Sequence, residues 1–287
     1  MTRRLTVVWP DRRVFQARKE VSVRLLAVSD AVDPALEHAV NREAIGRLDA
    51  VVGCGDLEPS YLGFLGDAFG VPVVFVRGNH DRGGHWSETS RKAPDHLSSG
   101  HLVDVAGITV APFEWPGLHT DRAMRDELHA WGDVLRLWRT LIARRIFRGQ
   151  APILVVSHAP PRGVGDHAAN RYHLGYASYR WLLDRLRPPL WLHGHVDPAS
   201  KTDWKTSCGQ TVVANVTGSV VVELIPPSRR SVAWADSADE PEAADRDPQV
   251  ASSTPAARAS SATDSSASLD VAVARSRPIT RLTPTSR

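Results

Sequence analysis

Short runs of apolar, mostly β-branched residues recur along the first 226 positions of the chain, with polar segments between them. Runs of this length without internal polar positions are typical of strands that are buried on both faces of a sheet. The pattern therefore predicts strands over residues 23–28, 50–52, 71–76, 108–111, 153–156, 190–192, 211–216 and 219–225.

Helical patterns lie between several of these strands. Residues 34–48 are predicted to be a helix, with Asp33 as its N-cap and Pro34 at its first helical position. Further helices are predicted over residues 59–69, 121–147 and 176–186. The alternation of strands and helices favours an α/β (α+β layered) fold, with central sheets and helices outside them, in a single domain.

The longest predicted helix, residues 121–147, is rich in Trp and Arg. Its apolar residues recur at three- and four-residue steps: Leu128, Trp131, Leu135, Trp138, Ile142 and Ile146. We interpret it as an outer helix that packs its tryptophans on the domain, or as a cap over the active site. Peripheral contact with a membrane surface is the less favoured alternative.

Residues 227–287 consist mostly of Ser, Ala, Thr, Pro, Asp and Arg, without an apolar period. Such a stretch buries too little apolar surface to offset the entropy of ordering it, so a disordered low-complexity tail is predicted. Residues 21–226 are assigned to one folded domain. Residues 1–20 are assigned to an N-terminal extension without a function.

Composition narrows the range of partners and the compartment. The formal net charge is only +3, and no dense basic patch is evident, so nucleic acid is not expected as the main partner. The two cysteines, Cys54 and Cys208, suggest a reducing compartment and no thiolate metal site. Neither a signal-peptide core nor an apolar run of about 18 residues occurs, so a cytoplasmic protein without a transmembrane helix is expected.

Polar residues follow several predicted strands at the point where each strand ends. The segments 29–30, 53–56, 77–81, 157–158 and 193–197 bring Asp, Asn or His to these positions, often beside Gly. Ligand sites of open α/β sheets lie beyond the carboxyl ends of the strands, so these segments are expected to converge. Glycine lets the backbone turn sharply and approach a bound ion.

Oxygen and imidazole ligands without thiolate suit Mn, Fe, Zn or Mg better than a structural zinc. A carboxylate such as Asp56 can bridge two ions. Two ions about 3.5–4 Å apart can clamp a phosphate and activate a water molecule for in-line attack.

The ordered set resembles the calcineurin-like metallophosphoesterase superfamily, whose pattern is D-x-H, G-D, G-N-H-D/E, a later His, and G-H-x-H. The matching positions are Asp30, Asp56, residues 78–81, His158 and residues 194–197. The resemblance spans residues 24–197 and implies a β-sandwich flanked by helices. It also implies one or two divalent ions, with Mn favoured and Fe, Mg, Ni or Zn as the other candidates.

The resemblance also implies roles for single residues. Asp30 would belong to the first ion, and Asp56 would bridge both ions. The second ion would be completed by Asn79, His158 and His195. His80 would protonate the leaving oxygen or steady the phosphate, and Asp81 would orient the His80 ring and raise its pKa. His173, in the loop after His158, is a candidate for substrate contact, although solvated loop residues are commoner.

The chain departs from the family pattern at two positions. Val32 and Asp197 stand where the family has histidines of the first metal. With Asp197 kept as a candidate ligand, the first site would be rich in carboxylate and better suited to Mn or Mg than to Zn. A centre with one metal is the alternative.

These residues predict a metal-dependent hydrolase that uses water to cleave a phosphomonoester or a phosphodiester. The short spans between the motifs favour a small phosphate ester as the substrate. The alternative is a catalytically degenerate metallophosphoesterase-fold protein that acts as a binding or regulatory module. Val32 and Asp197 favour the alternative, whereas the pair His80 and Asp81 favours the enzyme. No oligomeric state is predicted.

Overall fold

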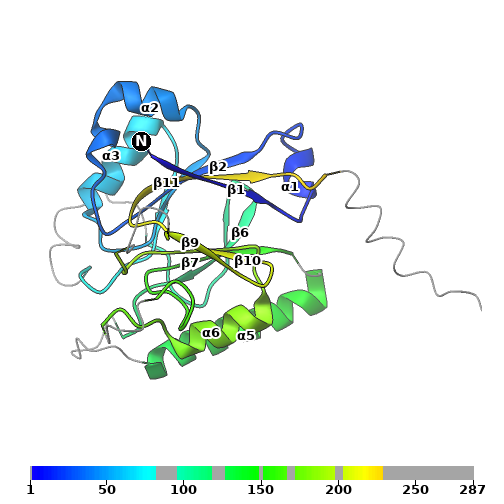
Figure 1. Cartoon of the computed structure of the whole chain (residues 1–287). Coiled ribbons are helices and arrows are strands. Elements are labelled where there is room, and N and C mark those ends of the chain that lie inside the picture. Colours follow the sequence, from blue (N-terminus) through cyan, green and yellow to red (C-terminus); the bar gives the residue numbers. More distant parts are fainter. Residues whose placement is uncertain are drawn as a thin grey trace, which may run out of the picture. The chain divides into compact units, whose positions relative to one another are not determined.

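Two β-sheets and two sets of helices build the part of the chain that the computed structural model describes, which is residues 2–81, 96–117, 127–148, 151–166, 172–197 and 203–228. The predicted fold class is confirmed, because the sheets lie between the helices (Figure 1). The tail, predicted over residues 227–287, lies outside the described residues from position 229 onward.

The first sheet has its strands in the order β1 (Arg3–Val8), β11 (Gly218–Ile225), β2 (Val23–Ser29), β3 (Ala50–Gly53) and β4 (Val73–Phe75). The order in the second sheet is β5 (Val103–Val105), β6 (Ile108–Phe113), β7 (Ile153–Ser157), β8 (Leu190–His193), β10 (Thr211–Asn215) and β9 (Lys205–Cys208). β2, β3 and β4 are parallel to one another, as are β6, β7 and β8. Their carboxyl ends therefore share one edge in each sheet.

The alternation of side chains along β2 shows why the central strands are apolar throughout. Leu25 and Ala27 pack between the two sheets, whereas Leu26 and Val28 pack under the helices on the outer face. Since each fully buried aliphatic side chain contributes about 1.5–3 kcal/mol, both faces of such a strand stabilise the fold.

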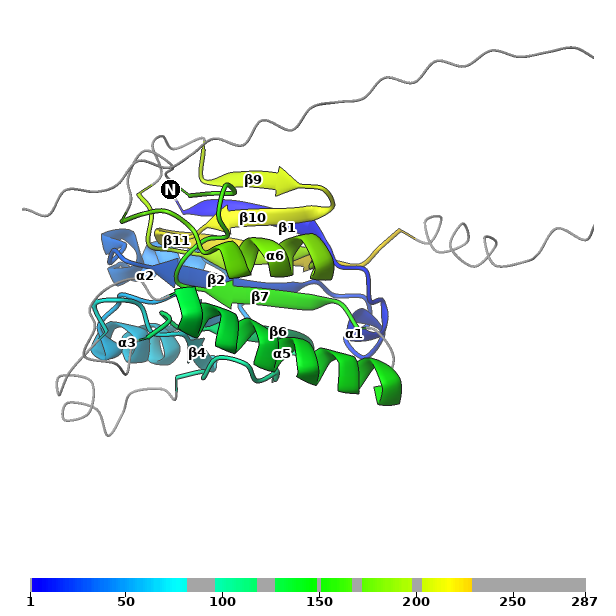
Figure 2. The same ribbon diagram turned by 90° about the horizontal axis from the view of Figure 1, so that it is seen from below.

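Helices cover the outer face of each sheet (Figures 1 and 2). The helices over the first sheet are the 3₁₀ helix η1 (Pro34–Glu37), α2 (Ala39–Ile45) and α3 (Pro59–Phe69). The helices over the second sheet are α5 (Glu127–Arg148) and α6 (Ala177–Leu186). None of the helices within the described residues combines the length and hydrophobicity that a membrane crossing requires.

The structure divides the helix predicted over residues 34–48. Asp33 caps η1 as predicted, because its side chain accepts a hydrogen bond from the Ala35 amide at 3.0 Å. His38 then has an extended backbone (φ −89°, ψ 125°), and α2 begins after it. One continuous helix is therefore wrong for this segment, since periodicity alone does not reveal a single extended residue.

The buried face of α5 differs from the predicted stripe. Ala130, Val134 and Leu137 are fully buried against the second sheet. Trp131 and Trp138 pack on Trp181 of α6, with ring centroids 5.6 and 5.3 Å apart, which confirms the expected packing of the tryptophans on the domain. The other apolar residues of the described part of the stripe are exposed: Leu128, Leu135 and Ile142.

Residues 1–20 contain β1 and the short helix α1 (Arg13–Gln16), which corrects the assignment of this segment to an extension outside the fold. β1 pairs in parallel with β11, from Arg3 opposite Val220 to Val8 opposite Ile225. Leu5 and Val7 are buried and alternate with exposed residues, the pattern of an edge strand with one face on the core. With Arg3 and Arg4 at its start and only two buried residues, the strand is too short and too polar to be predicted from the sequence pattern.

We predict that Leu5→Ala lowers the free energy of unfolding by about 2–4 kcal/mol, because it leaves a cavity under β1. Thr6→Ala, on the exposed face of the same strand, is the control and should change it by less than about 0.5 kcal/mol. Urea unfolding of both variants measures the difference. Equal midpoints for Leu5→Ala and the wild type would show that β1 does not belong to the folded core.

Candidate metal centre

The strand ends bring together three of the residues that were predicted to bind metal. Asp30 follows β2, Asp56 follows β3, and His158 directly follows β7. One ligand atom from each of these three residues lies within 4.8 Å of the other two. Carboxylate oxygens and an imidazole nitrogen therefore meet at one point where the two sheets adjoin, as expected from the parallel strands.

Three candidate ligands have a left-handed backbone: Asp30 (φ 59°), Asp56 (φ 55°) and His195 (φ 67°). This conformation costs roughly 1–2 kcal/mol for a residue with a Cβ, although Asp tolerates it better than most. Hydrogen bonds hold two of the strained positions, because the Asp30 amide donates to the Gly55 carbonyl at 3.1 Å and the Asp56 amide to Asp81 at 2.8 Å. Strain of this kind is typical of functional sites.

The fully buried His158 ring is oriented by the backbone. Its Nδ1 donates a hydrogen bond to the Cys54 carbonyl at 2.7 Å, which directs Nε2 toward the site. Nε2 lies 3.0 Å from Asn79 Oδ1 and 3.2 Å from Asp56 Oδ2. When the His158 ring is neutral, three electron-pair donors therefore face one another: His158 Nε2, Asn79 Oδ1 and Asp56 Oδ2.

The electrostatics of this cluster favour a positive charge. Burial opposes a charged His158 ring, but the hydrogen bond and the charge of Asp56 outweigh it and raise the pKa of His158 to about 9. Burial likewise opposes the charged Asp56 carboxylate, yet His158 and the His80 amide hold the pKa of Asp56 below its usual value. The same positions suit a divalent cation in place of the proton, so the donor set fits a metal.

The Asp30 carboxylate connects the end of β2 to the segments after β8 and β10. It accepts hydrogen bonds from the His195 amide at 3.0 and 3.1 Å and from the Thr217 hydroxyl at 3.1 Å. The His195 ring donates from Nε2 to the Tyr172 carbonyl at 2.9 Å, which leaves Nδ1 as its electron-pair donor. Burial, followed by the charge of His158, lowers the pKa of His195 to about 4, so the ring is neutral and suited to bind a metal.

Asp81 is buried and holds two loops together. Its Oδ2 accepts the amide of Asp56 at 2.8 Å and the amide of Gly78 at 2.7 Å. Burial raises the pKa of Asp81, and the nearby Asp56 charge raises it further, whereas the two hydrogen bonds lower it. The net effect is a pKa of about 6. The described hydrogen bonds of Asp81 do not include the His80 ring; they anchor the loops that carry Asp56 and Gly78.

His80 stands at the open rim of the cluster. Its amide donates to Asp56 Oδ1 at 2.8 Å, which fixes the backbone. Its side chain is 81% exposed, and its Nε2 lies 3.9 Å from Asp56 Oδ2. The ring can therefore reach a molecule that enters from solvent.

Two glycines of the motifs permit the close packing of the loops. A Cβ on Gly78 would lie 2.1 Å from Asp56 Oδ1, and a Cβ on Gly194 would lie 2.3 Å from Asp30 Oδ2. Both distances are far below van der Waals contact, so any side chain at these positions would displace a candidate ligand.

Asp197 is not part of the described ligand cluster. It is exposed and lines a separate cavity of about 510 Å³, together with the buried His193. Val32 is 45% exposed. The carboxylates that the structure brings to the first-metal side of the site are therefore those of Asp30 and Asp56.

The sequence analysis did not select Trp115, which lies just beyond the end of β6. Its ring centroid is 4.7 Å from that of His195 and 5.8 Å from that of His158, so it packs against both imidazoles. The neighbouring Glu114 forms a 2.6 Å ion pair with Arg77. The position of Trp115 after a predicted strand was a usable signal, but indole is not a metal ligand.

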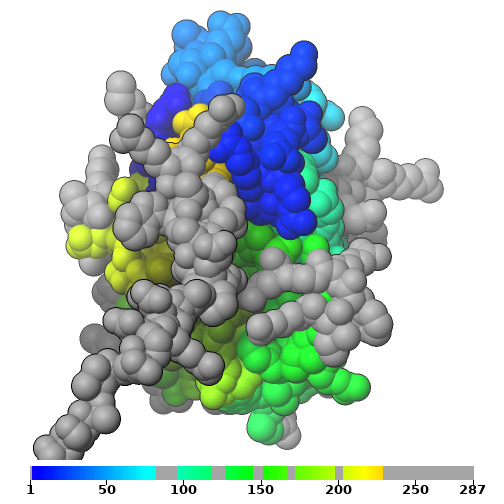
Figure 3. All heavy atoms as spheres, turned by 90° about the vertical axis from the view of Figure 1, so that its right-hand side faces the viewer, coloured from blue at the N-terminus to red at the C-terminus, as the bar shows by residue number. Residues whose placement is uncertain are grey.

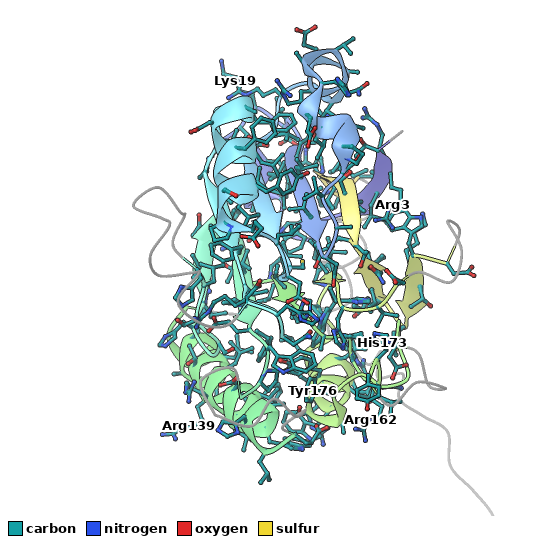
Figure 4. All side chains as sticks on the ribbon, turned by 90° about the vertical axis from the view of Figure 1, so that its left-hand side faces the viewer. Arg3, Lys19, Arg139, Arg162, His173 and Tyr176 are labelled. Atoms are coloured by element: carbon teal, nitrogen blue, oxygen red, sulfur yellow. The ribbon has the colours of Figure 1, made fainter. Side chains whose placement is uncertain are left out.

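The loop that precedes α6 brings His173 beside His195 and Tyr176 beside Trp115. The His173 ring lies 5.2 Å from the His195 ring, and both His173 and Tyr176 extend from this loop (Figure 4). His173 therefore lies beside the candidate centre, where its predicted contact with substrate is sterically feasible.

Comparisons with known proteins agree with this geometry. Residues 34–197 match the family model described as calcineurin-like phosphoesterase. None of the curated proteins matches the sequence.

Similar solved structures include phosphopantetheinyl hydrolase from Mycobacterium tuberculosis, at 13% identity and a TM-score of 0.45, covering 73% of this chain and 98% of that one. The protein TT1561 of Thermus thermophilus has 15% identity and a TM-score of 0.44, covering 69% and 90%. A dimetal phosphatase from Danio rerio has 11% identity and a TM-score of 0.44, covering 68% and 87%.

We predict that Asp81→Ala weakens metal binding about 10- to 100-fold, because the Asp56 loop loses its anchor. Asp81→Asn keeps one acceptor oxygen and should fall between this variant and the wild type. Equilibrium dialysis with Mn²⁺ measures the affinities, and Asp67→Ala on the exposed surface of α3 is the control. Wild-type affinity in Asp81→Ala would contradict the positioning role.

We also predict that Gly78→Ala abolishes stoichiometric metal binding, since its Cβ would overlap Asp56 Oδ1. Gly132→Ala is the matched control, because a Cβ there meets no atom within 4 Å. In a helix interior this change should stabilise the protein by roughly 0.5–1 kcal/mol. Metal content and thermal unfolding of both variants provide the test, and a fully metal-loaded Gly78→Ala variant would contradict it.

Proposed function

Because this chain belongs to the calcineurin-like phosphoesterase family, we propose that it hydrolyses the phosphoric ester bond of a small substrate, with divalent metal ions and water. The observation that carries the proposal is the convergence of Asp30, Asp56 and His158 within 4.8 Å, with His80 at the open rim. A phosphomonoester and a phosphodiester both fit an open rim of this kind.

The donor set supports Mn as the resident metal, with Fe, Mg, Ni and Zn as the other candidates. Asp30 and Asp56 would hold the first ion, Asp56 would bridge, and Asn79, His158 and His195 would hold the second. Bound there, divalent cations would stabilise charge on the phosphoryl oxygens and lower the pKa of water. The lack of a histidine at Val32 favours a harder metal at the first position.

His80 is proposed as the general acid. A water oxygen forms the new bond to phosphorus while the ester P–O bond breaks, and the leaving oxygen takes a proton from His80 Nε2. The attacking water releases a proton to solvent, and solvent reprotonates the exposed His80 ring. Anchoring of the His80 amide on Asp56 Oδ1 keeps the ring beside the ligand cluster while its side chain stays accessible. Asp81 acts here as a positioning residue through the same Asp56 loop.

The second candidate function is a binding or regulatory module that keeps the fold without catalysis. It is favoured by the exposure of Asp197 outside the ligand cluster and by Val32 at the position of a family histidine. His80 favours the enzyme, because its backbone is anchored to Asp56 while its ring stays exposed at the rim of the site.

The test is hydrolysis of p-nitrophenyl phosphate and bis-p-nitrophenyl phosphate by metal-stripped protein, reconstituted separately with Mn, Mg, Fe, Ni and Zn. We expect activity with Mn and a loss of about 10²- to 10⁴-fold in kcat for His80→Ala. Asn79→Ala should lose activity mainly through weaker metal binding. His101→Ala, an exposed histidine outside the site, should retain full activity.

The two functions predict different results with the same samples. A folded protein that binds metal but cleaves neither ester with any ion would favour the binding module. Preference for the mono- or the diester would identify the ester class.

A further inference from the structure

A line of exposed apolar side chains runs along α5. Leu128 is 82% exposed, and Leu135 and Ile142 are each 48% exposed. Consecutive members are seven residues apart, and at about 100° per residue they drift by only about 20° per step around the helix. The three side chains therefore form an apolar stripe on one side of α5, with about 10 Å along the helix axis between neighbours.

The stripe ends in a groove with an apolar floor and a basic rim. The groove has a volume of about 480 Å³ and lies between α5, the segment around α1 and the loop that leads into β8. Figure 3 looks onto this end of the domain, where the N-terminal segment (blue) lies next to the α5 region (green). Trp138, Leu141 and Ile153 line the floor, and Ile142 belongs to both stripe and groove.

Positive charge predominates at the rim. Among the described residues, four arginines and one acid line the groove: Arg13, Arg144, Arg185, Arg187 and Asp11. Only Arg13 forms an ion pair among the described residues, with Asp11 at 2.9 Å. Arg185 lies over the Trp181 ring at 4.1 Å, and Arg144 donates to the Thr109 hydroxyl at 3.1 Å. These two cations, and Arg187, have no carboxylate partner in the described structure.

Arg139 adds a further positive charge beside the stripe. It is four residues after Leu135 and therefore about 40° from it around the helix. It extends from α5 away from the domain (Figure 4). Apolar side chains flanked by arginines, with tryptophans at the border, are typical of helices that lie in the interface of a membrane.

We propose that this surface binds the headgroup region of an anionic phospholipid membrane. The α5 surface is defined by the residues Leu128, Leu135, Arg139, Ile142, Arg144, Arg185 and Arg187. The apolar stripe enters the boundary between headgroups and acyl chains, and the arginines bind lipid phosphates. Because Leu128, Leu135 and Ile142 face solvent, membrane contact is favoured here over an outer helix that packs the whole predicted stripe on the domain.

Charge favours lipid over a second copy of the chain. The acids available on α5 are already engaged, since Glu127 accepts from Arg162 at 3.2 Å and Asp133 from Arg136 at 3.1 Å. A second α5 surface packed against the first would therefore bring arginines together without carboxylates to pair them. An anionic bilayer supplies the missing negative charge.

The groove at the end of α5 is separate from the candidate metal centre. Ile153 and Pro189 in the groove lie at the amino ends of β7 and β8, whereas His158 and His195 follow the carboxyl ends of these strands. Changes in the groove should therefore leave hydrolysis of a soluble ester unchanged, and membrane binding can be tested independently of the proposed activity.

The experiment is co-sedimentation of the full-length protein with vesicles of phosphatidylcholine, with or without phosphatidylglycerol. We expect binding only to the anionic vesicles, and weaker binding at high salt. The double variant R185A/R187A should lose at least about tenfold in affinity for the anionic vesicles. L128S/L135S should also bind these vesicles more weakly than the wild type does. The charge-matched control is R4A/K19A, which removes two exposed cations outside this surface and should bind like the wild type.

Three results would overturn the proposal. Binding that the variants leave unchanged would place the contact elsewhere in the chain. Competition by inorganic phosphate at low millimolar concentration, at constant ionic strength, would indicate a site for free phosphate. A wild-type dimer without vesicles that L128S/L135S converts to a monomer, as measured by light scattering, would assign the stripe to a second copy.

Discussion

At the candidate metal centre, electron-pair donors of Asp56, Asn79 and His158 face one another across 3.0 to 3.2 Å. Such an arrangement is unfavourable unless a positive charge lies among the donors, and the rest of the fold supplies the constraints that keep them there. The Cys54 carbonyl fixes the His158 ring, and Asp81 holds the loops after β3 and β4 through two amides. Either a proton on His158, whose pKa is raised to about 9, or a divalent cation supplies this charge, so metal and proton compete for the same donors.

The two-sheet core makes these constraints effective. The loops that bear Asp30, Asp56, His158 and His195 leave strands that are buried on both faces, so each loop begins from a position that packing has already fixed. Parallel pairing of β2 with β3 and of β7 with β8 brings the loop origins to common edges. Asp30 then joins the two sheets directly, because its carboxylate accepts the amide of His195 from the second sheet. Rigid strands and short polar tips together tolerate the left-handed backbone at three candidate ligands.

Features that depend on residues adjacent in the sequence could be predicted, whereas features that depend on distant contacts could not. Buried strands followed by Asp, Asn or His carry both the fold and the site in adjacent residues, so the convergence of Asp30, Asp56 and His158 was predictable. The anchoring contacts were not, because Asp81 accepts backbone amides and Asp30 accepts the His195 amide, and any residue type can supply a backbone amide. β1 was missed because pairing with β11, more than 200 positions away, makes a short basic segment into a strand. Trp115 was missed because its role rests on packing alone.

The helix α5 illustrates a different limit. Its buried face, with Ala130, Val134 and Leu137, and its exposed stripe, with Leu128 and Leu135, both repeat with the helical period. Periodicity predicts a helix from either set but does not say which set meets the core. The predicted stripe contains the larger residues, yet the fully buried residues of α5 are Ala130, Val134 and Leu137, and the first two are small enough for close packing on the sheet. The large apolar residues and arginines that remain outside are therefore not required by the core, which leaves them available for the proposed membrane contact.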